Sequence, residues 1–73
     1  MTLQDVLKIA QQDESLWFRP VSLKGAKWAY IVKNGEVYSV PSARGGDYGV
    51  TAYVKYLLDD WEIVTADQVL DGE

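Results

Sequence analysis

The residues that could do chemistry are few in this chain of 73 residues, which contains no cysteine and no histidine. Their absence excludes thiol nucleophiles, imidazole bases, disulfides and zinc sites of the usual ligand types. A serine nucleophile would need another base, and Lys27 stands at no recognised spacing from a serine. The composition therefore predicts a protein that is not an enzyme and that uses no cofactor.

One carboxylate pair remains, Asp59 and Asp60, directly before Trp61. Neighbouring residues on a strand point to opposite faces, so the two acids are poorly placed to share a proton. One interpretation is structural, with an aspartate accepting backbone N–H groups at the turn into a strand. The other is that Asp60 hydrogen-bonds a ligand while Trp61 stacks beside it. No further oxygen ligands stand at a recognised loop spacing, so we expect no metal site.

Aromatic residues are unusually frequent, at nine in the chain. Pairing across a hairpin explains several of them, Trp28 included. Nine rings are nevertheless many for so small a core, so we expect some to be exposed or at an interface. Such rings could hold a planar ligand such as adenine, with Arg19, Lys24 or Arg44 on its phosphates.

The stretch Pro41 to Gly49 contains three glycines together with Arg44 and Tyr48. This composition fits a binding loop, and it fits a solvated connection equally well. No phosphate-binding motif of the Walker or dinucleotide type occurs in it.

Two local patterns define the first half of the fold. Apolar residues recur at helical spacing over Leu3 to Ala10, with Thr2 as the N-cap and Asp5 as the acid of a capping box. Alternating strands over 27–33 and 36–40 flank Asn-Gly, which favours a tight antiparallel hairpin turn.

The remaining elements are less regular. We predict a strand over Ser15 to Arg19 that stops at Pro20, a short helix over Ala52 to Leu58, and a last strand over Asp60 to Thr65, followed by one helical turn. The fold class is α+β: one domain, residues 1–73, with an N-terminal helix on a small antiparallel sheet and a short second helix before the last strand.

Charge and size indicate the kind of partner. Acidic residues outnumber basic ones by 11 to 7, for a net charge of −4, which argues against binding polymeric nucleic acid. A core this small, without disulfides or metal, favours self-association, so we expect a homo-oligomer, a dimer or tetramer. No membrane segment or secretion signal is apparent, so we expect a cytoplasmic location.

The helix over Leu3 to Ala10, the strand arginine Arg19, the aromatic hairpin from Trp28 to Tyr38 and the closing Leu-Leu-Asp-Asp-Trp-Glu-Ile-Val at 57–64 together resemble one family. This is the phage Thoeris anti-defence 2-like family, and the closing block is its most specific match. The chain differs at Ser22, where the family usually carries a tryptophan.

The resemblance implies a homo-oligomeric phage protein in the bacterial host cell that sequesters a cyclic ADP-ribose-type or cyclic oligonucleotide signal without cleaving it. The expected ligand-binding residues are Arg19, Trp28, Arg44, Tyr48, Asp60 and Trp61. The alternative is a small acidic interaction module that binds a host protein and no nucleotide, with its aromatics as hot spots.

Overall fold

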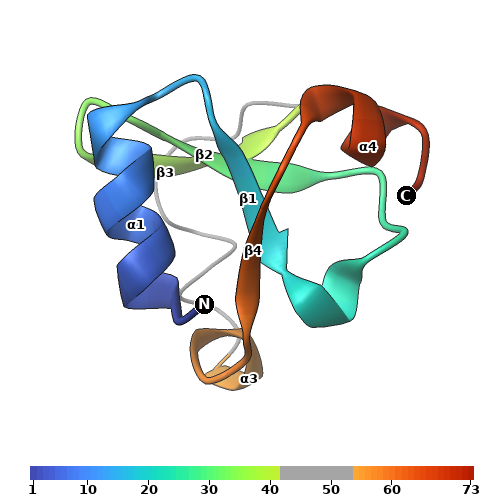
Figure 1. The fold of residues 1–73 in the computed structure, drawn as a ribbon, viewed down its shortest axis with the longest axis horizontal. Coiled ribbons are helices and arrows are strands. Elements are labelled where there is room, and N and C mark those ends of the chain that lie inside the picture. Colours follow the sequence, from blue (N-terminus) through green and yellow to red (C-terminus); the bar gives the residue numbers. More distant parts are fainter. Residues whose placement is uncertain (42–53) are drawn as a thin grey trace.

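The computed structural model describes residues 1–41 and 54–73, which form a four-stranded antiparallel sheet with a helix against each face (Figure 1). The strand order is β3-β2-β1-β4. The predicted α+β class, with the N-terminal helix on an antiparallel sheet, is confirmed. The elements are α1 (Leu3–Gln12), β1 (Trp17–Pro20), η1 (Val21–Leu23), β2 (Ala29–Lys33), β3 (Glu36–Val40), α3 (Val54–Leu57), β4 (Trp61–Val64) and α4 (Ala66–Leu70).

Helix α1 begins at the predicted capping box. The Thr2 hydroxyl accepts the Asp5 N–H at 3.1 Å, and the Asp5 carboxylate accepts the Thr2 N–H at 3.4 Å. This reciprocal pair satisfies two donors that the helix itself cannot satisfy. Val6 and Ala10, one turn apart, are the buried residues of the helix and place its apolar stripe on the sheet.

The β2–β3 hairpin also forms as predicted. Asn34 (φ 53°) and Gly35 (φ 78°) both have positive φ, as a type I′ turn requires. The ladder runs from Lys33 opposite Glu36 to Ala29 opposite Val40. Strand β2 begins at Ala29, two residues later than the predicted start at Lys27.

Strand β1 lies between β2 and β4, and it includes Pro20 as its last residue, where the prediction ended at Arg19. A proline fits there because β2 pairs with β1 only opposite Phe18. No β2 carbonyl therefore needs a hydrogen bond from the N–H that proline lacks. Pairing with β4 continues past the proline, since the Val21 N–H donates to the Asp60 carbonyl at 2.8 Å.

The two faces of the sheet carry separate cores. Phe18, Tyr30 and Trp61 pack with the apolar stripe of α1 on one face. On the other face, a second cluster joins the sheet to Val69 of α4 and has Trp17 at its margin. Because side chains alternate along a strand, β1 sends Phe18 to the α1 face and sends its two neighbours to the α4 face.

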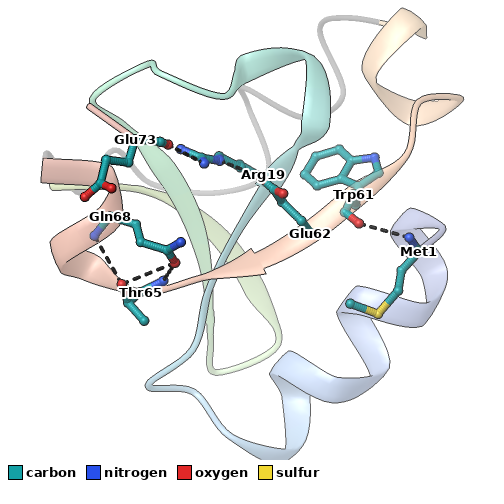
Figure 2. Close-up of polar contacts among 7 residues, drawn as sticks. All are labelled: Met1, Arg19, Trp61, Glu62, Thr65, Gln68 and Glu73. Atoms are coloured by element: carbon teal, nitrogen blue, oxygen red, sulfur yellow. Dashed lines mark hydrogen bonds and ion pairs between the residues drawn. The ribbon is translucent and has the colours of Figure 1, made fainter. Parts of the chain in front are cut away.

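The last third of the chain confirms three predicted elements. Helix α3 precedes β4 and ends at Leu57, one residue before the predicted end at Leu58; residues 52 and 53 of the predicted range lie outside the described residues. Helix α4 begins at a second capping box, in which Thr65 and Gln68 satisfy each other's backbone N–H groups (Figure 2). None of the helices in the described ranges has the length and apolar character needed to cross a membrane.

Candidate functional site

Arg19 is the one buried charged side chain among the described residues, with 1% of its surface exposed. It extends from β1 on the α4 face, directly opposite Glu62 of β4 in the strand register. Its Nε donates to the Glu62 carboxylate at 2.8 Å, forming an ion pair across the two strands (Figure 2). The Glu62 side chain is 33% exposed, so the pair reaches the surface on its acidic side.

The far end of the guanidinium meets the end of the chain. The Arg19 Nη2 donates to the Glu73 main-chain oxygen at 2.6 Å. The third nitrogen, Nη1, is buried and has no hydrogen-bond partner within residues 1–41 and 54–73. A guanidinium carries five N–H donors in a rigid fork, so this burial leaves part of its binding capacity unused.

The other predicted ligand-binding residues on strands lie on the opposite face of the sheet. Trp61 is 1% exposed within the α1-face core, where its Nε1 donates to the Tyr56 carbonyl at 2.7 Å. Trp28 packs half-buried at the margin of the same core, edge-on to Tyr30 with ring centroids 5.2 Å apart. The sheet therefore separates both indoles from Arg19 within one protomer.

Asp60 is exposed at the turn before β4, while Arg44 and Tyr48 lie outside the described residues. Asp60 donates its own N–H to the Asp59 carboxylate at 2.9 Å. The structural interpretation of the acidic pair is thereby confirmed for Asp59, which accepts backbone N–H groups at the turn. Asp60 keeps an exposed side chain at the same end of the sheet.

Ser22 is bound to the acidic pair. Hydrogen bonds from the Ser22 hydroxyl and from the Asp60 backbone, in that order of importance, hold the pKa of the Asp59 carboxyl below its ordinary value. Ser22 thus has a defined structural role: it ties η1 to the turn before β4.

The expected exposed aromatic surface is not found among the described residues. Seven of the nine aromatics are described; three are buried and four half-buried: Trp17, Phe18, Trp28, Tyr30, Tyr38, Tyr56 and Trp61. Four of these rings contact one another, those of Phe18, Trp28, Tyr30 and Trp61, which explains these four as parts of the core.

The exposed apolar surface is aliphatic instead. Leu58 is 84% exposed directly after α3, and Leu57, Met1 and Val21 are also exposed. Met1 and Val21 both hydrogen-bond to the backbone at the start of β4, so these four residues gather at one end of that strand. We name them the β4-start surface. Leu57 and Leu58 lie in the helix predicted over Ala52 to Leu58, but no local pattern marked their side chains as exposed.

The described residues contain no group of three or more carboxylates that could hold a metal ion. Comparison with known protein families, with curated proteins and with solved structures finds no match to this chain. Arg19 and the β4-start surface are therefore the two features of the described chain from which a function can be inferred.

Glu62→Gln tests whether the ion pair supports the fold. Removing the carboxylate leaves the Arg19 charge buried and poorly compensated, so we expect a loss of about 1 to 3 kcal/mol in unfolding free energy, at the lower end because Glu62 is partly exposed. The measurement is urea denaturation followed by tryptophan fluorescence. The double variant Arg19→Met/Glu62→Gln should regain much of the lost stability, because it no longer buries a charge. If Glu62→Gln alone were as stable as the original chain, the ion pair would not support the fold.

Ser22→Ala tests the bond to the acidic pair. We expect the pKa of Asp59 to rise toward its ordinary value, because its first stabilising hydrogen bond is gone. Asp59 has a lowered pKa in the folded state, so its contribution to stability is present above the unfolded pKa and is lost as the pH falls through the folded one. The measurement is an NMR titration of the carboxyl carbons.

Ser15→Ala is the matched control for that titration. Ser15 lowers the pKa of Asp13 by the same kind of bond, from its hydroxyl at 2.6 Å. The Ser15→Ala variant should raise the pKa of Asp13 and leave the pKa of Asp59 unchanged. An Asp59 pKa that does not respond to loss of Ser22 would show that the turn is held in another way.

Proposed function

We propose that this protein is a non-enzymatic phage anti-defence protein, acting in the bacterial host cell, that binds and sequesters a cyclic ADP-ribose-type or cyclic oligonucleotide signal as a homo-oligomer. The observation that carries the proposal is Arg19: a nearly fully buried guanidinium with one nitrogen unpartnered among the described residues. Burying a cation costs free energy unless its donors are satisfied, so an unused donor in this position suits an acceptor supplied by a ligand.

Phosphate is the natural acceptor for such a group. Its oxygens match the spacing of a guanidinium fork, and the contact is charge-assisted. The net charge of −4 does not prevent this, because a small nucleotide is bound by local cations and not by a broad basic surface. Arg44 and Tyr48 remain candidates for the same ligand.

Assembly would supply the rest of the site. Arg19 and the half-buried ring of Trp28 lie on opposite faces of the sheet, so one ligand cannot contact both within a single protomer. A second copy could bring its own ring, or its exposed Asp60, to the Arg19 face. The β4-start surface, with Leu58 at 84% exposure, supports self-association because exposed apolar residues grouped in one patch mark interaction sites.

The alternative function is an acidic module that binds a host protein. The β4-start surface also favours this, since exposed aliphatic side chains beside Asp60 resemble the apolar centre and polar rim of an interface. The hot spots would then be leucines, because the described aromatics are buried or half-buried.

Calorimetric titration with cyclic ADP-ribose isomers and with cyclic di- and trinucleotides tests the proposed function. We expect one member of the panel to bind at sub-micromolar Kd, because a sponge must compete with the effector that the signal activates. Chromatography of the released ligand should return it unchanged. Silence across the panel from a folded protein would contradict sequestration and favour the host-protein alternative; a converted ligand would contradict the non-enzymatic part.

Two variants locate the binding site in that titration. Arg19→Lys keeps the charge but removes the fork, so we expect at least a tenfold loss of affinity, about 1.4 kcal/mol. Lys33→Gln, at the exposed end of β2, is the control for a general charge effect and should bind as the original chain does. Equal losses in both variants would argue against a site at Arg19.

Leu58→Glu tests self-association through the β4-start surface. A charge at this exposed position should not disturb the fold, but it should not be tolerated inside an apolar interface. We expect the sedimentation coefficient to fall to that of a smaller species, with unchanged circular dichroism. Lys8→Glu, on the exposed side of α1, is the control. An unchanged oligomer in Leu58→Glu would place the interface elsewhere.

A further inference from the structure

We propose that residues Asp71–Glu73, here called the latch, form a displaceable cover over an oxyanion subsite made by the Nη1 and Nη2 edge of Arg19. This deepens the proposed function and rests on it, because it states how ligand access to the same arginine is controlled. The ligand group is a phosphate or phosphodiester oxygen pair, and the latch must leave before that pair can bind.

The three nitrogens of the Arg19 guanidinium differ in their partners. Glu62 takes Nε, which leaves the end-on edge of the guanidinium, Nη1 with Nη2, for another partner. In the structure that edge holds a single acceptor, the main-chain oxygen of Glu73 at 2.6 Å from Nη2. This main-chain oxygen stands where one oxygen of a bidentate anion would bind, and Nη1 has no second acceptor among the described residues.

The latch is only weakly attached. Its two side chains, those of Asp71 and Glu73, are both exposed. Apart from the bond to Arg19, backbone hydrogen bonds to α4 hold it: Asp71 to Asp67 at 2.9 Å, Gly72 to Val69 at 3.1 Å and Glu73 to Gln68 at 2.8 Å. Helix α4 itself is anchored by Val69, which is fully buried in the α4-face core. The latch can therefore open while α4 stays in place, because it buries no apolar side chain of its own.

A substitution at Gly72 can shift the equilibrium between the closed and the open latch. It has φ +78°, which an L residue disfavours, and its backbone lies against that of Gly25. A Cβ at this position would meet the Lys27 Cε at 3.5 Å and the Gly25 oxygen at 3.7 Å, both ordinary contacts. Gly72→Ala therefore acts on the closed latch through φ and not through a clash.

The experiment measures how fast phenylglyoxal, an arginine-specific reagent, modifies Arg19 in the full chain, with mass-spectrometric peptide mapping to separate Arg19 from Arg44. In Gly72→Ala we expect Arg19 to react about tenfold faster. The closed latch requires a positive φ at residue 72, and an alanine disfavours that conformation by enough to change the closed-to-open ratio by about this factor. Asp71→Ala is the matched control: the same new side chain, one position earlier, at an ordinary φ of −83°. It should react as the original chain does.

Amide hydrogen exchange of β1 and β4 in the same samples identifies the kind of opening. Protection of these strands should stay unchanged in Gly72→Ala. Faster Arg19 modification accompanied by faster exchange of both strands would overturn the proposal, because general unfolding would then explain it. The proposal would also be overturned if Gly72→Ala left the rate of Arg19 modification unchanged.

Inorganic phosphate tests the oxyanion part. It should slow Arg19 modification in Gly72→Ala several-fold, relative to sodium chloride at the same ionic strength. Equal rates in the two salts would overturn the subsite. None of these measurements contains a nucleotide, so an open latch with phosphate protection, together with silence in the calorimetric panel, would reject the nucleotide ligand and leave the latch standing.

Discussion

A guanidinium buried in a small protein must find acceptors nearby, since an uncompensated buried cation would cost more than such a core can offset. Arg19 finds them at two points far along the chain, at Glu62, 43 residues later, and at Glu73, 54 residues later. One side chain of β1 thereby joins both β4 and the segment after α4 to the centre of the sheet. This interaction links β4 and the segment after α4 to the sheet, while the buried Val69 anchors α4 itself.

The sheet divides the molecule into two faces with different chemistry. On the α1 face, Phe18, Tyr30 and Trp61 fill the core with rings whose centroids lie about 6 Å apart. This face is well packed and has a structural explanation in full. The α4 face combines a smaller aliphatic core with the Arg19–Glu62 pair, and its polar end is covered by weakly held backbone. A ligand that uses Arg19 must approach on this second face.

The β4-start surface lies where several chain segments converge. Met1 pairs with the backbone of Trp61, Val21 bonds to Asp60, and Ser22 fixes Asp59. These polar contacts hold the backbone at this end of β4 and leave Leu57 and Leu58 exposed beside it. A fixed backbone carrying exposed leucines suits an interface, since little conformational entropy is lost when such a surface docks.

The sequence by itself determined the elements whose signals are local. The capping box at Thr2, the Asn34-Gly35 turn, the alternation along β2 and the helical turn after β4 are set by contacts within a few residues, and all were predicted. Only the tertiary structure decided which face each strand residue takes. It placed Arg19 and Trp61 on opposite sides of the sheet and buried Trp61, which was expected to stack on a ligand. The reason is physical: register between distant strands, and the acceptors that a buried charge recruits across the chain, follow from packing that no local pattern encodes.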